Sequence, residues 1–369
     1  MTRARRLLLG LAAALPLLLT GCIKSGESSG AVNGTTLYLF DSTAPQILVW
    51  KDLSAVYDAA APPAADLALT SSALTRSQPL AWGGMAMDTQ RNHLYLLYQD
   101  GSVIRIDQLR SQSGTVQSNN LILFTLDSSQ RLTGSVFGQL ALDTQTDTLY
   151  ACESGTSGIS RVWAVSQPDV IANSGTAPFV TVTDDESGTG SVGAAAGQNG
   201  IYAYFAGGNQ VTSGISTYNG PRLRKGASGA FGASNVIIGG ATGLDQSATG
   251  SLALDTANST LFVGLDTGST SAGSPTGGAP ILAFQTGQFG LAPNQQPRFW
   301  LGDTTTGAIM ALSHAGTRAW LLGLQGTRST GVQTILVWKQ PAAGVAVKPL
   351  AMGPTTAQYL AAAMDGTGS

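Results

Sequence analysis

Short apolar runs alternate with turns rich in Gly, Ser, Thr and Asp along most of the chain, and apolar positions within each run lie two residues apart. This period predicts β-strands, in which successive side chains point to opposite faces of a sheet. A helical interpretation fails because the period is wrong and because the 47 glycines would destabilise helix interiors. The chain is therefore expected to be all-β.

One unit of this pattern recurs about every 55 residues. Six times, an apolar residue followed by an aromatic one marks the start of a strand-like run, at Leu37-Tyr38, Leu94-Tyr95, Leu149-Tyr150, Ile201-Tyr202, Leu261-Phe262 and Ala319-Trp320. The apolar run before it ends at a landmark position, which holds Asp88, Asp143, Ala195, Asp255 and Ser313 in successive units. Repetition at this period predicts repeated small β-sheets of four strands each.

The two ends of the repeat array complete one another. The segment Leu360–Asp365 has the pattern of a first strand with nothing after it, whereas Leu37–Asp41, Gln46–Lys51 and Asp66–Thr70 supply strands two to four without a first strand. Radially repeated four-stranded sheets with joined ends form a β-propeller. Residues 35–369 are thus predicted to be a six-bladed β-propeller, closed by pairing of the C-terminal strand with the N-terminal blade. A seven-bladed ring is the main alternative, and a two-sheet sandwich is a weaker one.

Side-chain size along the repeat supports this arrangement. The predicted first strands are rich in Gly and Ala, as converging strands near an axis require. Aromatic residues occupy matching positions in the predicted third strands, at Trp50, Tyr218, Phe284 and Trp338. We expect these rings to fill the space between neighbouring blades, where the sheets diverge.

The amino-terminal residues have the pattern of a secretory signal. Arginines at positions 3, 5 and 6 precede the apolar stretch Leu7–Leu19, which is shorter than the roughly 20 residues that a membrane span requires. The tetrapeptide Leu19-Thr20-Gly21-Cys22 resembles the bacterial lipobox. The resemblance implies that residues 1–21 are a lipoprotein signal peptide and that Cys22 is lipidated, with palmitate among its acyl chains.

The segment after the signal predicts where the protein resides. Residues 22–34 comprise the lipidated cysteine and a Gly/Ser-rich flexible tether. Several acyl chains anchor a protein stably to a membrane, and Ile23 stands where a signal for inner-membrane retention would have aspartate. We therefore expect a protein of the cell envelope, anchored by lipid to the outer membrane in a cell with two membranes.

The repeats resemble the NHL/YVTN-like propeller repeats of bacterial extracytoplasmic proteins. The resemblance rests on the pattern Ala-x-Asp-Thr, four residues, Leu-Tyr and then Ile-x-Val-Trp, and it covers residues 35–369. It implies the propeller fold much more strongly than any activity.

Charge and cysteine content exclude some functions. The formal net charge of −2 becomes about −5 when the three signal arginines are removed, which argues against a nucleic-acid partner. Cys152 is the only cysteine besides Cys22, so the mature chain has no intramolecular disulfide. We interpret Cys152 as a small apolar core residue.

No set of residues predicts catalysis, a cofactor or a metal centre. The recurrent aspartates follow first strands, where a carboxylate that accepts hydrogen bonds from the next backbone amides explains them. His93 and His314 fall in the same turns, in different blades, and are a poor metal set. No catalytic or cofactor-binding residue is therefore assigned.

Two charged clusters are weak candidates for binding. Asp184, Asp185 and Glu186 form the densest acidic group, which offers oxygen ligands for calcium without EF-hand spacing. We favour the simpler explanation that these three carboxylates are solvated side chains of an ordinary surface loop. Arg222, Arg224 and Lys225 form a basic group in the fourth unit. This group could contact the phosphates of lipid headgroups, and the alternative is that it only increases solubility.

The sequence favours a binding or assembly module over an enzyme. The expected partner is an unknown protein or glycan that contacts the propeller's loop face. The alternative is a hydrolase or lyase that acts on sugars or lactones at the pore mouth, with Asp41, Glu153, Asp184 and Asp266 as its carboxylates. A quinone-dependent dehydrogenase ranks last, because no ligand set is recognisable.

Overall fold

The computed structural model describes residues 35–156, 160–166, 168, 179–184, 194–197, 200–205, 214–218, 235–238, 241–244, 250–265, 281–288, 294–302, 307–315, 320–327, 331–339, 341, 348–350 and 357–366. Residues 1–31 form a separate unit from Val32–Ser369, and the fold described here belongs to the second unit. Within the described part, no helix has the length and hydrophobicity needed to cross a membrane.

The described strands form six four-stranded antiparallel sheets. Sheets one to three, written from the inner strand outward, are β24 (Tyr359–Asp365), β1 (Thr36–Asp41), β2 (Gln46–Trp50), β3 (Leu67–Thr70); β4 (Leu80–Asp88), β5 (His93–Tyr98), β6 (Ser102–Ile106), β7 (Leu121–Thr125); and β8 (Val136–Asp143), β9 (Thr148–Ser154), β10 (Ser160–Ser166), β11 (Phe179–Asp184). Sheets four to six are β12 (Ala194–Gly197), β13 (Gly200–Phe205), β14 (Gly214–Tyr218), β15 (Asn235–Ile238); β16 (Gly250–Asp255), β17 (Thr260–Leu265), β18 (Ile281–Gln285), β19 (Phe299–Leu301); and β20 (Ile309–His314), β21 (Trp320–Thr327), β22 (Gly331–Lys339), β23 (Lys348–Leu350).

The helical elements are short and lie in the connections. Among the described residues they are α1 (Leu53–Asp58), which Asp52 caps by accepting hydrogen bonds from Ser54 and Ala55, and 3₁₀ turns at Ser72–Leu74, Leu109–Ser111, Ser118–Asn120, Ser128–Gln130 and Thr286–Gln288. The all-β prediction is therefore confirmed.

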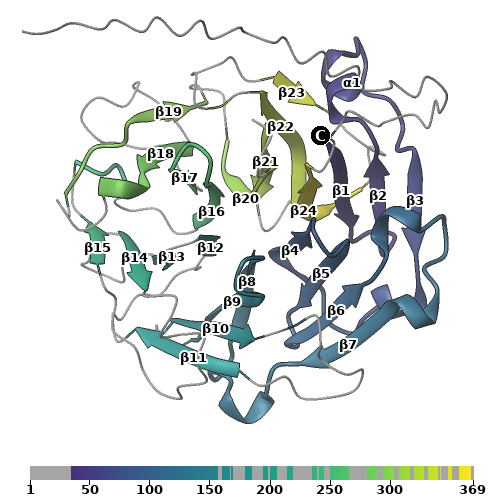
Figure 1. The fold of residues 1–369 in the computed structure, drawn as a ribbon, viewed down its shortest axis with the longest axis horizontal. Coiled ribbons are helices and arrows are strands. Elements are labelled where there is room, and N and C mark those ends of the chain that lie inside the picture. Colours follow the sequence, from purple (N-terminus) through teal and green to yellow (C-terminus); the bar gives the residue numbers. More distant parts are fainter. Residues whose placement is uncertain are drawn as a thin grey trace, which may run out of the picture. The chain divides into compact units, whose positions relative to one another are not determined.

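The inner strands surround a common centre (Figure 1). In the order β24, β4, β8, β12, β16 and β20, each inner strand contacts the next, and β20 contacts β24 again. This closed sequence of radially arranged sheets is a β-propeller, as predicted. No seventh sheet occurs among the described residues.

Strand β24 closes the array by pairing with β1. The register joins Thr36 with Asp365 and Tyr38 with Ala363, and it shifts by one residue between Phe40 and Asp41. The expected pairing of the carboxyl-terminal strand with Leu37–Asp41 is thus confirmed. Every other described sheet consists of consecutive strands, so this is the described sheet that joins strands from the two ends of the chain.

Hydrophobic cores fill the spaces between neighbouring sheets. One cluster joins Leu37 and Trp50 of the first sheet with Leu322 and Val337 of the sixth. Similar clusters join sheets one and two, two and three, four and five, and five and six. The predicted third-strand aromatics Trp50, Phe284 and Trp338 are at most 1% exposed. The side chain of Tyr218 lies outside the described part.

Two strand assignments made from the repeat spacing are wrong by two residues. In the other sheets, the landmark aspartate lies opposite the first residue of the second strand. Gly197 has this place in the fourth sheet and Ala315 has it in the sixth, whereas the spacing assigned it to Ala195 and Ser313. In the fourth sheet only two residues separate Gly197 from Gly200, against four in the other hairpins. A two-residue slip keeps every side chain on the same face, so the hydrophobic pattern cannot detect it.

The connections divide the propeller into two faces. On the loop face lie the turns between second and third strands, at 42–45 and 99–101, and the links between successive sheets, at 71–79 and 126–135. The turn face at the other end of the strands carries 51–66, 89–92, 107–112, 144–147 and 256–259. Because antiparallel strands reverse direction at each turn, all six sheets present the same kinds of connection to the same face.

Deletion of residues 356–369 is expected to give an insoluble or protease-sensitive protein, because it removes β24. The strand buries Leu360 and Met364, which are 7% and 5% exposed, and each contributes roughly 1.5–3 kcal/mol. Together with lost strand pairing, this approaches a total stability of about 5–15 kcal/mol. Limited proteolysis and thermal melting measure the effect. Deletion of residues 367–369 leaves β24 intact and serves as the control, and equal melting of both proteins would contradict the prediction.

Candidate functional site

The recurrent aspartates on the turn face hold hairpins together. Asp88 Oδ1 accepts hydrogen bonds from the backbone amides of Gln90 and Arg91 at 3.0 and 2.9 Å. Asp143 and Asp255 accept equivalent bonds from Gln145 and Asn258, at 3.1 and 3.0 Å. The residues before the second strands, Asn92, Asp147 and Ser259, have positive φ angles of 60°, 47° and 50°. This recurring geometry matches the structural role predicted for the aspartates.

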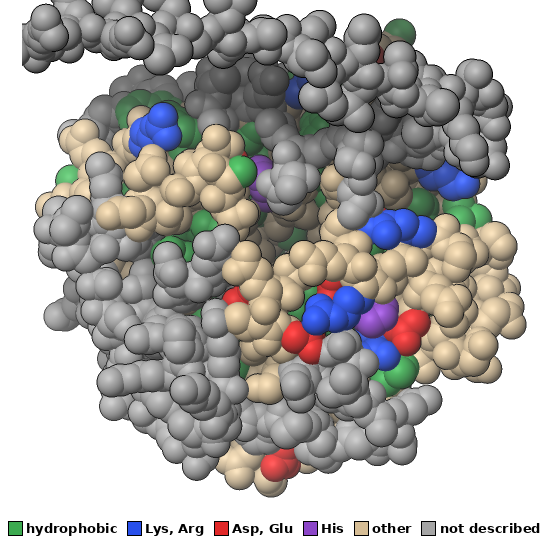
Figure 2. Space-filling view, in the orientation of Figure 1, with side chains coloured by type: hydrophobic (Ala, Val, Ile, Leu, Met, Phe, Trp, Pro, Cys, Tyr) green, Lys and Arg blue, Asp and Glu red, His purple; other side chains and the backbone are tan. Residues whose placement is uncertain are grey.

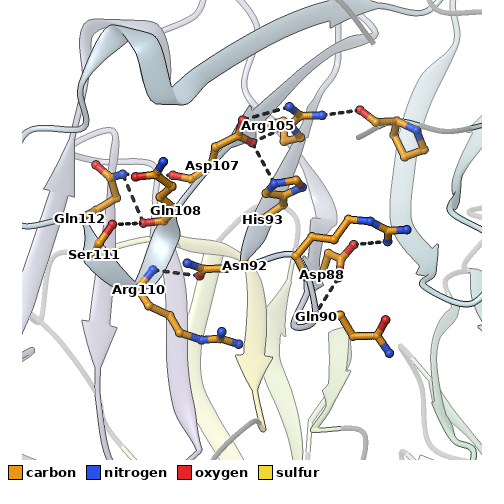
Figure 3. A network of polar contacts seen from close by, with 12 residues as sticks. Asp88, Gln90, Asn92, His93, Arg105, Asp107, Gln108, Arg110, Ser111 and Gln112 are labelled. Atoms are coloured by element: carbon orange, nitrogen blue, oxygen red, sulfur yellow. Dashed lines mark hydrogen bonds and ion pairs between the residues drawn. The ribbon is translucent and has the colours of Figure 1, made fainter. Parts of the chain in front are cut away.

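A network of polar contacts connects the second and third sheets on the turn face (Figure 3). The Arg105 guanidinium, 5% exposed, donates to both Asp107 oxygens at 2.6 and 2.9 Å and to the Pro168 carbonyl at 2.7 Å. His93 Nε2 lies 3.5 Å from Asp107 Oδ1. His93 is thus the first residue of β5 and part of this network, rather than a turn residue. The network is structural, because each charge faces a partner.

Arg110 connects the second sheet to the carboxyl-terminal strand. Its Nε and Nη2 donate to the two oxygens of Asp365 at 2.6 and 3.0 Å, and Nη2 also donates to the Thr89 carbonyl at 2.7 Å. The Asp365 side chain is only 3% exposed, and hydrogen bonding to it raises the pKa of Arg110 above its usual value. This paired geometry fixes the end of β24 against its neighbouring sheet.

Basic, acidic and histidine side chains gather in one region of the face seen in Figure 2. Among the described ion pairs of the turn face, Arg91 pairs with Asp88 and Asp147, Arg105 with Asp107, and Arg110 with Asp365. Because these arginines and aspartates neutralise one another, their charges contribute little to the binding of a charged ligand.

The carboxylates proposed for a hydrolase or lyase do not form a described active site. Asp41 accepts hydrogen bonds from the Thr43 amide and the Gln46 side chain, at 2.9 and 3.3 Å. Glu153 is fully buried and accepts from the Leu132 amide at 3.1 Å and from Trp163 Nε1 at 2.8 Å. The two belong to the first and third sheets, which the second sheet separates. Each therefore has a local structural role.

The side chains of the remaining acidic and basic candidates lie outside the described part of the chain. Asp184 ends β11, but its side chain is outside the described part, as are Asp185, Glu186 and Asp266. The basic residues Arg222, Arg224 and Lys225, and the proposed lipidation site Cys22, also lie outside the described residues. Among the described residues, no group of three or more His, Cys, Asp or Glu side chains could hold a metal ion.

Arginines on the loop face lie against aromatic rings. The guanidinium of Arg76 is 5.9 Å from the Tyr98 ring centroid, and that of Arg131 is 4.8 Å from the Phe137 ring. Arg76 also donates to Ser102 Oγ at 2.7 Å. These contacts order the described links between sheets and so give the loop face a defined shape.

Segment 128–136 presents a mixed surface on the loop face. Val136 is 46% exposed, and among the side chains that the structure describes it is the only exposed large hydrophobic one. The residues before it on the segment include the exposed Ser128, Ser129, Gln130 and Thr133. An exposed apolar residue amid polar groups is a common composition for a protein contact. The sequence analysis missed this feature, because exposure depends on which neighbours fold over the residue.

Cys152 is fully buried and forms no disulfide with a described residue, as expected. Burial raises the pKa of its thiol, so the reactive thiolate is disfavoured. No nucleophile is assigned at this position.

An axial cavity of about 160 Å³ lies among the inner strands β4, β8, β16, β20 and β24. His314 lines it, with a side chain that is only 2% exposed. Its Nε2 is 3.5 Å from Asp255 Oδ2, and its ring stacks on Phe262 at 6.0 Å. His314 is the last residue of β20, so its assignment to a turn was wrong. Its position follows from the two-residue slip in the sixth sheet.

Comparisons with known proteins show the fold but no family. No protein-family model and no curated protein matches the chain. A nidogen/laminin complex is 11% identical with a TM-score of 0.51, and the match covers 90% of this chain and 98% of that one. A Bacteroides caccae protein of unknown function is 9% identical with a TM-score of 0.52, with the same coverage. At these identities the similarity shows that this protein is an all-β β-propeller.

Replacement of Arg110 by alanine is expected to lower the free energy of unfolding by roughly 1–3 kcal/mol, because the buried Asp365 loses its charged donor. Chemical denaturation measures the change. Arg298→Ala is the matched control, since the Arg298 side chain is exposed and its guanidinium donates to Gln285 Oε1 at 3.1 Å, with no carboxylate among its described partners. Adding Asp365→Asn should recover part of the loss, and equal stabilities for the two arginine variants would refute the assignment.

Stability is expected to fall as the pH decreases below about 6.5, the ordinary pKa of histidine. Burial lowers the pKa of His314 in the folded protein, although the nearby Asp255 opposes this shift. The unfolded state therefore binds the proton more readily, and the loss is at most about 1.4 kcal/mol per pH unit. Melting temperatures between pH 8 and 5 test this. His314→Phe should show a shallower decline, and an identical profile would contradict the assignment.

Proposed function

We propose that this protein is a bacterial envelope lipoprotein whose NHL/YVTN-like repeats form a six-bladed propeller that acts as a binding or assembly module. Residues 1–21 direct secretion, lipid on Cys22 anchors the mature chain, and residues 22–34 tether the propeller to the membrane. The outer membrane is the proposed location, because Ile23 is not an inner-membrane retention residue. The lipobox-like tetrapeptide carries this part of the proposal.

The proposed partner is a protein or glycan that contacts the loop face. The observation that carries this assignment is segment 128–136, where the exposed Val136 lies among polar side chains. The propeller fold is consistent with a protein-binding module, and one similar structure is a nidogen/laminin complex. Since fold does not determine function, the assignment rests on the residues of the loop face.

A binding function also agrees with the state of the described ionisable groups. Asp41 and Glu153 on the loop-face side, and the aspartates of the turn face, accept hydrogen bonds that hold local structure. Catalytic groups require an arrangement in which they can reach a substrate. The described carboxylates therefore favour a scaffold that presents a surface over the hydrolase or lyase alternative.

Anchoring is tested by fractionation of cells that produce the full chain or its Cys22→Ser variant. The full chain should appear with membranes and incorporate radiolabelled palmitate. The variant lacks the acceptor thiol and should lose the label and separate from the membranes. Label on the variant, or its absence from both proteins, would reject the lipoprotein assignment.

Partner binding is tested by affinity capture from detergent-solubilised envelopes. Val136→Arg places a charge in the proposed contact and should reduce recovery of the partner about tenfold or more, as expected for a central contact residue. Gln90→Arg adds the same charge to an exposed turn-face position and should leave recovery unchanged. Equal recovery with both variants, or capture of lipid alone, would count decisively against loop-face recognition.

A further inference from the structure

Strand β4 has a bulge at its loop-face end. Its pairing with β5 is interrupted between Leu80 and Met85, where residues 81–84 form the bulge. Gly83 has a φ angle of 69°, and a Cβ at Gly84 would lie 2.8 Å from two backbone carbonyl oxygens. Only glycine fits both conditions without strain, so this pair of glycines permits a tight bulge that other residues would disturb.

Trp82 lies in this bulge and reaches the axis of the propeller. Its side chain packs against two hydrophobic clusters. One cluster contains Leu37 and Leu39 of β1 and the other contains Tyr38 and Phe40, so the two clusters lie on opposite faces of the first sheet. A ring that contacts both clusters must cross an edge of that sheet. The edge that contacts β4 is the inner strand β24.

The exposed part of Trp82 faces the loop side of the molecule. Trp82 is only partly buried, but it is not among the residues that line the axial cavity. The β4 residues of that lining run from Met85 to Met87, toward the turn face. On the other side of Trp82, Pro79 ends the loop-face link 71–79, and its carbonyl accepts from the Gln99 amide at 2.9 Å. An aromatic surface therefore lies where the axis meets the loop face.

The exposed side chains of the described links on the loop face are uncharged. Within 71–79 and 126–135, the exposed residues are Ser, Thr, Gln, Pro and Gly, with no Lys, Arg, Asp or Glu among them. The turn face differs, because it exposes Lys51, Asp58 and Asp66. The described loop face thus offers hydroxyl and amide groups to a partner.

Charged residues in these links are engaged within the protein. Arg76 lies 3.4 Å from Asp100, and Arg131 lies 3.5 Å from the buried Glu153. Asp127 accepts hydrogen bonds from the backbone and side chain of the 3₁₀ turn that follows it, at 2.9 and 2.8 Å. A partner at this part of the loop face therefore meets neutral polar groups, and ion pairs contribute little to its recognition.

We propose that the loop face binds an uncharged glycan, with Trp82 as the surface on which a sugar ring stacks. Sugar rings have faces of C–H groups that pack on the negative face of an aromatic ring, and their hydroxyls match neutral donors and acceptors. A protein interface has a larger apolar core, whereas Val136 is the one exposed large hydrophobic residue among the described side chains. This inference rests on the proposed binding function and names the class of its partner.

The test uses the full chain, immobilised in detergent, and glycans released from the envelopes of the cells in which the protein is native. Protease treatment frees the glycans of protein, and anion exchange divides them into a neutral and an acidic pool. The column should retain the neutral pool, and retention should change less than about twofold between roughly 0.15 and 1 M NaCl, because salt screens only charges. Retention of the acidic pool alone, loss of retention at high salt, or retention of neither pool would overturn the proposal.

Three variants locate the site. Trp82→Leu keeps an apolar side chain against both clusters but removes the aromatic face, so it should reduce retention of the neutral pool about tenfold. Trp82→Phe keeps an aromatic face and should reduce retention about threefold at most. Trp300→Leu is the matched control, because Trp300 is also partly buried but lies on the outer strand β19, and it should leave retention unchanged. Melting curves establish that each variant is folded, and equal retention by folded Trp82→Leu and Trp82→Phe would reject stacking on Trp82.

The outcome also separates this inference from the binding function on which it rests. If neither glycan pool is retained but a protein is captured from envelopes in a manner that Val136→Arg abolishes, the glycan is rejected and the binding module stands. If neither a glycan nor a protein is captured, both proposals fail.

Discussion

The pairing of β24 with β1 is the interaction on which the rest of the fold depends. Five sheets consist of consecutive strands, but the first sheet combines strands from opposite ends of the described chain. The two cores on either side of this sheet include residues from both β24 and β1, so each requires the closure. The bidentate contact between Arg110 and Asp365 adds a charged hydrogen-bond pair at the end of the same strand. Closure therefore combines backbone pairing, apolar burial and electrostatics in one place.

The two faces of the propeller use their polar residues differently. On the turn face, carboxylates accept hydrogen bonds within hairpins and pair with arginines between sheets. On the loop face, Arg76 and Arg131 pack on aromatic rings, and Val136 remains exposed. The connections on this face carry few residues that recur from sheet to sheet. Their side chains can therefore form a surface that is specific for one partner. This difference is the physical basis for placing recognition on the loop face.

The propeller geometry also explains the chemistry of its centre. An inner strand pairs on one side only, which leaves amides and carbonyls along its other edge. The protein satisfies some of them with side chains, since Gln139 pairs with Leu252, and Ser251 Oγ accepts from the Leu312 amide at 2.7 Å. Side chains of the inner strands therefore connect sheets to one another around the axis.

The sequence by itself determined the strand period, the repeat, the all-β propeller and the closing strand, because local alternation and recurrence encode them. The role of the hairpin aspartates was also predictable, since it depends on residues within four positions. The register of the fourth and sixth sheets was not, because a two-residue slip at Ala195 or Ser313 preserves the side-chain faces. Only the tertiary structure brought Gln139 to Leu252, Arg110 to Asp365 and His314 to Asp255. These contacts join residues distant in sequence, and their geometry is decided by how whole sheets pack around the axis.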